Sequence, residues 1–320
     1  MMSWSRVMLL LVWTPLLWTS LLAVEDGVPG SAPDNDSQPA SAALSSFDLL
    51  FLSERSGDSQ LHRLDLDSGL VSQVTRHLSP VHGPRWLRGR HAVVVAGERE
   101  GLSWLYQIDL GGLKMVPIFS NPAGDEVPDW SPGEDRWVYM KHRGEQKDIF
   151  LSGVGNESPR ALTDDPVEDK QPRWSPDGRR IVFVSSMEGH QDIYLMNPDD
   201  NSRTNITGHP ALEGHPRWSP DGKRILFYRY AQGRADLYLM NSDGSDMVNL
   251  TPGEGNELVG DWSPDGAWIA FGSDRTGDWE LYLMRSDGTD TRQVTHQPGF
   301  DGDPAWVPRQ DGAAGGATRK

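Results

Sequence analysis

The 320-residue chain contains no cysteine, and it has fewer basic than acidic residues, 30 Lys and Arg against 46 Asp and Glu. The absence of cysteine excludes disulfide bonds, thiolate zinc sites, cysteine nucleophiles and a lipid-modified N-terminal cysteine. A cysteine-free sequence is compatible with any redox compartment. The net charge of −16 argues against a nucleic-acid partner, because phosphate binding needs a basic surface.

Long apolar runs are scarce, and the clearest one is N-terminal. Arg6 precedes residues 7–23, which are uncharged and mostly apolar, and acidic residues begin at Glu25. This pattern predicts a signal peptide over residues 1–23, cleaved after Ala23, and therefore an exported protein without stable membrane insertion after cleavage. An uncleaved anchor is the alternative, although an apolar run of this length is short for a membrane span. The compositions of residues 24–46 and 309–320 predict a flexible linker and a flexible tail.

Tryptophan, by contrast, is abundant, and six of its 13 copies recur every 44 residues. This interval is typical of the four-stranded blades of β-propellers. Other positions recur with it: a Pro two residues before, an aromatic residue twenty after and a Thr thirty-three after the tryptophan in most units. The six positions are Trp86, Trp130, Trp174, Trp218, Trp262 and Trp306. These tryptophans are expected to form a structural ring, each packed between adjacent blades.

Each repeat predicts four strands, A to D, with strand A innermost. In the unit of Trp174 we expect strands at 171–174, 180–185, 192–197 and 204–207, with a Ser-Pro-Asp-Gly turn after strand A. The first unit lacks strand A, which the segment around Trp306 supplies. Because closure protects strand edges, residues 47–308 are predicted to form an all-β, six-bladed β-propeller, closed by the C-terminal strand joining the N-terminal blade.

The segments 174–178, 218–222 and 262–266, each Trp-Ser-Pro-Asp-Gly, resemble the WD40-like repeats of the TolB-like family. The strands Ile-Tyr-Leu-Met at 193–196 and Leu-Tyr-Leu-Met at 237–240 are also similar to that family. The resemblance covers about residues 47–308 and implies a periplasmic propeller of the Gram-negative cell envelope. Unlike family members with an N-terminal α/β domain, this sequence has only residues 24–46 before the first blade, which puts contacts made by that domain in doubt.

An acid stands five residues before the ring tryptophan in five of six units. We expect these acids in the D→A loops, at the mouth of a central channel: Asp125, Asp169, Glu213, Glu257 and Asp301, with His215 and Asp303 two residues deeper. An outer collar is expected in the B→C loops on the same face, formed by Arg55, Arg99, Arg143, Arg229, Arg234 and Arg275. Directly before the ring tryptophans, we expect charges that pair across blades: Arg85, Asp129, Arg173, Arg217 and Asp261.

Three interpretations of the acidic mouth stay open. It could hold Ca²⁺, which favours several oxygen ligands, bind a basic peptide segment of a partner, or consist of solvated acids repeated by duplication. The sequence shows no catalytic constellation and no Gly-x-Ser-x-Gly elbow. We therefore expect a monomeric, non-catalytic scaffold that binds a protein or peptide and has no cofactor. The alternatives are a small-molecule or Ca²⁺-binding propeller, or a hydrolase or lyase that uses the mouth carboxylates.

Overall fold

The computed structural model describes residues 44, 46–76, 78, 80–87, 92–99, 102–111, 113–120, 128–144, 146–153, 159–253 and 255–309. The predicted signal peptide, nearly all of the predicted linker and residues 310–320 of the predicted tail lie outside the described residues. So does Asp125. Within the described part of the chain, no helix has both the length and the apolar character needed to cross a membrane.

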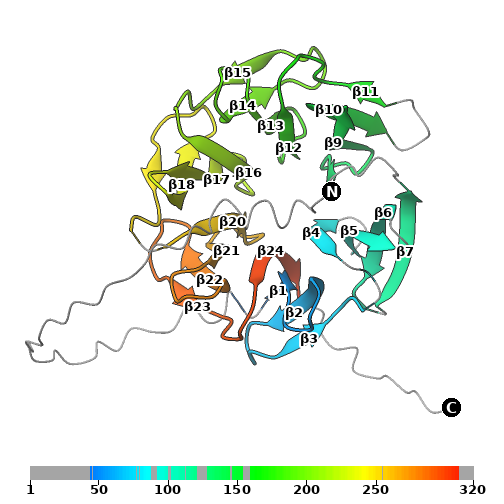
Figure 1. Cartoon of the computed structure of the whole chain (residues 1–320), viewed down its shortest axis with the longest axis vertical. Coiled ribbons are helices and arrows are strands. Elements are labelled where there is room, and N and C mark those ends of the chain that lie inside the picture. The colour runs from blue at the N-terminus through cyan, green and yellow to red at the C-terminus, as the bar shows by residue number, and fades with distance from the viewer. Residues whose placement is uncertain are drawn as a thin grey trace, which may run out of the picture. The chain divides into compact units, whose positions relative to one another are not determined.

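Six four-stranded antiparallel sheets are arranged in a ring (Figure 1), so the predicted all-β, six-bladed propeller is confirmed. The first three blades contain, from the inner strand outward, β24 (Asp301–Pro308), β1 (Phe47–Ser53), β2 (Gln60–Asp65) and β3 (Val71–Gln73); β4 (Val81–Leu87), β5 (Ala92–Arg99), β6 (Leu102–Asp109) and β7 (Lys114–Ser120); and β8 (Asp129–Trp130), β9 (Arg136–Arg143), β10 (Gln146–Gly153) and β11 (Arg160–Ala161).

The other three blades have the same order. They contain β12 (Asp169–Trp174), β13 (Ile181–Ser185), β14 (Asp192–Met196) and β15 (Arg203–Asn205); β16 (Leu212–Trp218), β17 (Arg224–Ala231), β18 (Arg234–Asn241) and β19 (Val248–Asn249); and β20 (Glu257–Trp262), β21 (Trp268–Ser273), β22 (Glu280–Arg285) and β23 (Arg292–Gln293).

The C-terminal strand closes the ring as the sequence predicts. β24 pairs antiparallel with β1, with Trp306 opposite Leu49, and the first and last described strands therefore share one sheet. The ring of Phe47 meets that of Trp306 edge-on, with centroids 6.1 Å apart. An aromatic pair thus reinforces the hydrogen bonds that join the two ends of the propeller.

The ring tryptophans pack between blades. Trp218, only 8% exposed, packs with Val182, Val184 and Ile193 of the preceding blade. Its indole Nε1 donates a hydrogen bond to the carbonyl oxygen of a residue in that blade's inner strand at 3.3 Å. The guanidinium of Arg180 lies 5.0 Å from its ring centroid, within the range of a cation–π contact. At this interface, burial, a satisfied N–H and a cation therefore hold one blade to the next.

The recurring Thr has a structural role at the end of each blade. Thr251 Oγ1 accepts a hydrogen bond from the backbone N–H of Leu237 at 2.9 Å, and so satisfies a buried donor on strand C beyond the short strand D. The same bond recurs in four further blades, from Leu61 to Thr75, Ile149 to Thr163, Ile193 to Thr207 and Leu281 to Thr295. The thirty-three-residue offset is therefore a capping device of the blade.

The inner strands begin earlier than the sequence analysis expected. In the unit of Trp174, strand A starts at Asp169 rather than at residue 171, because Asp169 still pairs with Ser185 beyond a bulge. The bulge contains Gln171, whose φ is +56°, followed by a Pro whose missing N–H suits a position outside the ladder. Four other blades have the same register shift. It moves the repeated acids from loops into strands.

Candidate functional site

The four described acids of the predicted channel mouth are buried rather than exposed. Asp169, Glu213 and Glu257 are 0% exposed and Asp301 is 2% exposed. Their position beyond the bulge explains this burial, because it places each carboxylate inside the sheet instead of in a solvated loop. The expected acidic funnel is therefore not formed by these four side chains, and binding of a partner by them stays a prediction.

Three of these acids pair with arginines of the predicted outer collar. Arg229 donates hydrogen bonds to Glu213 Oε1 from Nε at 2.8 Å and from Nη2 at 2.6 Å. Arg55 Nη2 donates to Asp301 Oδ2 at 2.6 Å. These three acids and three of the collar arginines are thus partners in ion pairs with a buried carboxylate, not members of two rings of opposite charge that face solvent.

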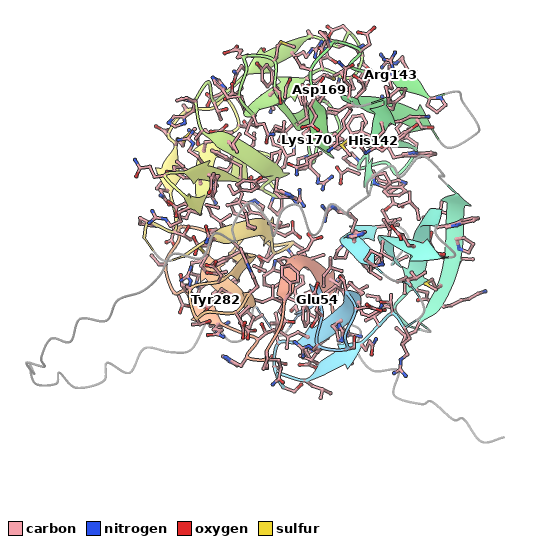
Figure 2. The ribbon with its side chains drawn as sticks, in the orientation of Figure 1. Glu54, His142, Arg143, Asp169, Lys170 and Tyr282 are labelled. Atoms are coloured by element: carbon pink, nitrogen blue, oxygen red, sulfur yellow. The ribbon has the colours of Figure 1, made fainter. Side chains whose placement is uncertain are left out.

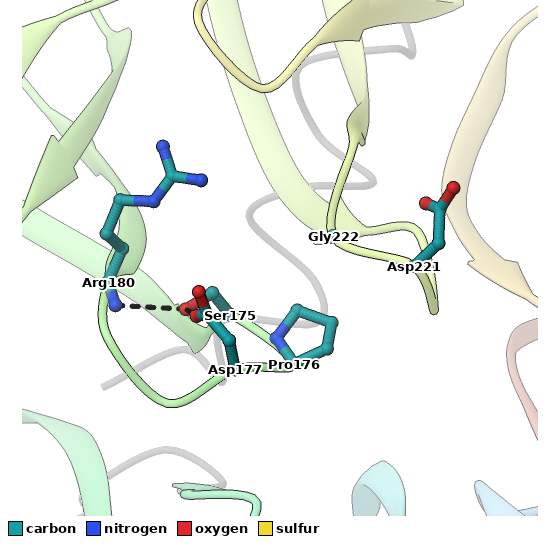
Figure 3. Close-up of a pocket in the computed structure, with 6 residues that line it drawn as sticks. All are labelled: Ser175, Pro176, Asp177, Arg180, Asp221 and Gly222. Atoms are coloured by element: carbon teal, nitrogen blue, oxygen red, sulfur yellow. Dashed lines mark hydrogen bonds between the residues drawn. The ribbon is translucent and has the colours of Figure 1, made fainter.

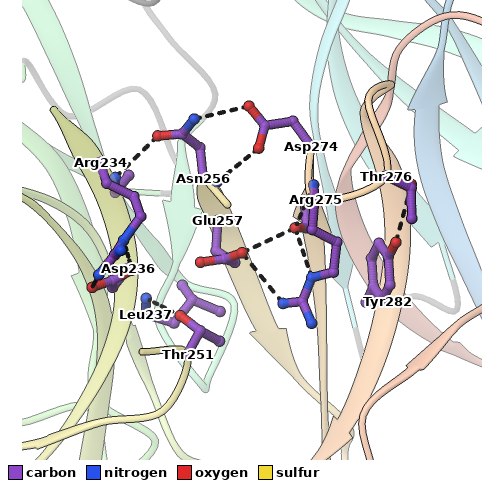
Figure 4. A network of polar contacts seen from close by, with 12 residues as sticks. Arg234, Asp236, Leu237, Thr251, Asn256, Glu257, Asp274, Arg275, Thr276 and Tyr282 are labelled. Carbon is purple, nitrogen blue, oxygen red and sulfur yellow. Dashed lines mark hydrogen bonds and ion pairs between the residues drawn. The ribbon is translucent and has the colours of Figure 1, made fainter. Parts of the chain in front are cut away.

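The third pair lies in a wider polar network (Figure 4). Glu257 Oε1 accepts hydrogen bonds from Ser273 Oγ at 3.0 Å and from Arg275 Nη2 at 3.3 Å. The guanidinium of Arg275 also lies 4.6 Å from the ring centroid of Tyr282. Burial raises the pKa of Glu257, and the bonds from Ser273 and other donors oppose that shift. The network fixes strand B against strand A within this blade.

Asp169 differs from the other three acids. Its nearest cation is Arg203, whose Nη1 lies 3.5 Å from Asp169 Oδ2 and closer, at 2.6 Å, to Asp165 Oδ2. Burial, followed by the charge of Asp165, raises the pKa of Asp169 to about 6, although the nearby hydroxyl groups of Ser185 and Thr163 oppose this shift. Figure 2 shows Asp169 beside Lys170 on the inner strand of its blade. A buried carboxyl group with this pKa can exchange a proton near neutral pH.

The remaining collar residues are more exposed. Arg143 is 51% exposed and lies 3.2 Å from Asp148, and Arg234 is 42% exposed and binds Asp236 through Nε and Nη2. The side chain of Arg99 lies outside the described residues. Of the six predicted collar arginines, Arg143 and Arg234 therefore remain at the surface of the B→C hairpins.

His215 and Asp303 occupy the bulge position of their inner strands, with φ of +52° and +48°. Burial, followed by the charges of Arg217, Arg173 and other cations, lowers the pKa of His215 well below 6.5. The expected cross-blade pairing is seen between Arg217 Nε and Asp261 Oδ1, at 4.0 Å. Arginines that directly precede the ring tryptophans therefore act electrostatically on His215.

The two faces of the ring differ in regularity. On the face of the A→B turns, Ser175 Oγ donates to Asp177 Oδ1 at 2.6 Å, and the equivalent pairs at 219–221 and 263–265 do the same at 2.7 and 2.5 Å. On the opposite face, six residues connect strands B and C at 54–59, 186–191 and 274–279, whereas two residues connect them in the other three blades. This second face is the one on which the blades differ.

Sequence reasoning missed two hollows between successive A→B turns. The first, about 290 Å³, is lined by Ser175, Pro176, Asp177, Arg180, Asp221 and Gly222 (Figure 3). The second, about 320 Å³, has the equivalent lining one blade further on. The uniform turns gave no signal of them, because each hollow forms only where two blades meet.

For a metal ion, the described residues contain no cluster of three His, Cys, Asp or Glu side chains that could hold one.

The ring of sheets defines the class of protein as a six-bladed β-propeller. A family model described as the TolB beta propeller domain matches residues 125–257, and one described as the N-terminal region of dipeptidyl peptidase IV matches residues 219–310. The first match and the neighbours described next show that the chain is similar to TolB-like β-propellers. No curated protein matches the chain.

Several solved structures share the fold. TolB from Acinetobacter baumannii is 20% identical with a TM-score of 0.73, over 83% of this chain and 67% of that one. A putative TolB from Agrobacterium tumefaciens is 20% identical with a TM-score of 0.62, over 82% and 98%. An oligogalacturonate lyase in complex with manganese is 16% identical with a TM-score of 0.56, over 80% and 75%. TolB proteins and an enzyme thus share this fold, which leaves catalytic status open.

Proposed function

We propose that the chain is an exported, non-catalytic propeller that binds a protein or peptide partner in the cell envelope, through the face of the B→C and D→A loops. The observation that carries this proposal is the contrast between the faces: the A→B turns repeat, whereas the B→C connections have six residues in three blades and two in the other three. Loops that vary on a rigid scaffold are the usual place for binding residues.

Apolar side chains on this face support a protein partner. Met187, in the six-residue loop of one blade, and Leu212, at the start of the next inner strand, are each 42% exposed. Their segments are joined by the hydrogen bond from Glu213 N to Gln191 O at 3.0 Å. Two exposed apolar residues on connected segments offer contact area that does not depend on the buried acids.

The charge of the chain favours a basic partner segment. The net charge is −16, and a negative protein attracts positive segments by long-range electrostatics. Export to the periplasm is supported by the apolar segment at residues 7–23 and by the TolB proteins among the structural neighbours. The partner would accordingly be an envelope protein or peptide.

Affinity capture from envelope extracts tests the proposal. The bait would be the mature chain, compared with the variants Met187→Glu and Leu212→Glu, and with Val248→Glu as a control. Val248 is 55% exposed but lies on β19, the outer strand of its blade. We expect an envelope protein that is captured by the wild type and by the control, and lost with the two loop-face variants. Identical captured proteins for all four baits would overturn the proposal.

A catalytic function has one specific observation in its favour, the pKa of Asp169 near 6. A carboxyl group with such a pKa suits general acid or base chemistry near neutral pH. The test is turnover of oligosaccharide or peptide substrates by the purified chain and by Asp169→Asn. Activity that disappears with Asp169→Asn would replace the binding proposal with a catalytic one.

A further inference from the structure

Three arginines at the inner edge of the ring form a cluster that the proposed function does not use. Arg85 on β4, Arg173 on β12 and Arg217 on β16 each directly precede a ring tryptophan. Figure 1 shows these three strands on the inner side of the ring. Arg173 and Arg217 are only 8% and 6% exposed. In all three, Nη1 donates a hydrogen bond to the carbonyl oxygen of the preceding proline, at 2.7, 2.8 and 3.2 Å. We call these three residues the axial arginine cluster.

The positive charges of the cluster act on one another. Burial lowers the pKa of Arg173 well below its usual value, and the charges of Arg217 and Arg85 lower it further. The same three arginines and Lys170 oppose protonation of His215, whose pKa is lowered first by burial. Cations from three blades therefore act on one another, and two of them, Arg173 and Arg217, are buried. A bound anion would stabilise such an arrangement.

The carboxylates around the cluster make little direct contact with its guanidinium groups. Within the described residues, one ion pair is found for the three guanidinium groups, that of Arg217 with Asp261 at 4.0 Å. Asp129 Oδ2 instead accepts a hydrogen bond from the backbone N–H of Trp174 at 2.7 Å. Asp261 likewise accepts hydrogen bonds from backbone N–H groups. These carboxylates are thus partly committed to bracing strands.

Nitrogen atoms of the cluster are left without partners. The Nε atoms of Arg85 and Arg173, and Nδ1 of the neighbouring His215, are buried and have no hydrogen-bond partner in the described structure. A buried donor without an acceptor costs about 1–3 kcal/mol. Unused donors beside closely spaced cations are the features expected of a site for an oxyanion.

We propose that the axial arginine cluster binds a carboxylate group of a ligand. The planar guanidinium fork matches the two oxygens of a carboxylate. A phosphate would bring a second negative charge near Asp129, Asp261 and Asp303, whose charges already act on Arg173 or Arg217. A single negative charge fits this balance better. The carboxylate can belong to a small molecule or to the C-terminus of a peptide, and this proposal stands independently of the loop-face partner.

Calorimetric titration of the mature chain tests the proposal with three probes. N-acetylglycine represents a small carboxylate, N-acetylated tetra-alanine with a free C-terminus represents a peptide, and N-acetylated tetra-alanine amide is the uncharged control. We expect the wild type to bind one or both free carboxylates and not the amide. Binding of N-acetylglycine points to a small-molecule source, and binding of the free peptide alone points to a peptide C-terminus.

Matched variants locate the binding. Arg173→Gln should weaken carboxylate binding about tenfold or more, because a charge-assisted hydrogen bond is lost. Arg180→Gln is the control, since Arg180 contacts Trp218 and lines a hollow at the A→B turns. If Arg173→Gln does not fold, Arg217→Lys keeps the charge but loses the fork, and it too should weaken binding. No binding by the wild type, equal binding of the amide, or equal losses in variant and control would overturn the proposal.

Discussion

Replacement of Glu213 by alanine should lower the free energy of unfolding by about 3–5 kcal/mol, the usual effect of removing one partner from a buried ion pair. Glu213 is 0% exposed, and Arg229, which donates to it at 2.8 and 2.6 Å, has a side chain only 10% exposed. Water therefore has little access to the guanidinium of Arg229 and replaces few of the hydrogen bonds that the carboxylate of Glu213 accepted. The guanidinium would remain stacked on Tyr238, 4.7 Å from the ring centroid, without its carboxylate.

Guanidinium chloride unfolding followed by tryptophan fluorescence measures this effect. The control is Arg234→Ala, which breaks the pair between Asp236 and an arginine that is 42% exposed, and it should change stability less because water can replace the guanidinium. Burial raises the pKa of Glu213 in spite of Arg229, so the pair carries a desolvation cost. The double variant Glu213→Met with Arg229→Met should therefore recover much of the loss. If Glu213→Ala is no more destabilising than Arg234→Ala, the carboxylate is solvated and the structural role assigned to it is wrong.

Three further predictions concern the same framework. The pKa of Asp169 is raised from 3.8 to about 6, so between these pH values the folded state keeps a proton that the unfolded state has released. The stability of the wild type relative to Asp169→Asn should therefore fall by up to about 3 kcal/mol as pH rises from about 4 to about 6. A difference in urea unfolding that does not change with pH would contradict this. Thr251→Val removes the acceptor of the Leu237 N–H and should cost about 1–3 kcal/mol in thermal or chemical unfolding, whereas no change would mean that the bond is replaced. Deletion of residues 300–320 removes β24 and should give an unfolded or oligomeric protein by size-exclusion chromatography; a monomer with an unchanged melting temperature would argue against closure through β24.

The sequence could predict the ring because each blade has the same packing problem. Trp218 fills the space between two sheets, so the same residue is needed at every interface and its 44-residue spacing reports the blade directly. Phe227 and Tyr238, opposite each other on neighbouring strands with ring centroids 5.8 Å apart, recur for the same reason. Fold class and closure follow from such repeated contacts.

The environment of the acids could not be predicted, because it depends on a bulge with a weak sequence signal. The bulge position has φ of +51° even in Val259, a β-branched residue that disfavours this conformation. A glycine, Gly83, occupies the equivalent position in the blade of Trp86, but Gln171, His215 and Asp303 occupy it elsewhere, so glycine is no consistent signal of the bulge. Without the bulge, the acid five residues before the tryptophan falls in a loop. With it, Glu257 becomes the first residue of a strand and pairs opposite Ser273. The hollows were missed for a related reason, since they belong to blade interfaces rather than to single repeats.

A comparison of equivalent positions in the six blades distinguishes residues with a structural task from residues with a functional one. The blades meet nearly the same structural demands, so a position with a purely structural task should carry similar residues throughout, as the acid five residues before the tryptophan does in five of six blades. The position directly before the ring tryptophan does not follow this rule. Around the ring, this position is occupied in turn by Arg85, Asp129, Arg173, Arg217, Asp261 and Ala305. Packing alone does not require the charge at this position to change from blade to blade. A ligand that contacts different blades with different atoms does require it. The uneven B→C loops break the symmetry in the same way on the outer surface.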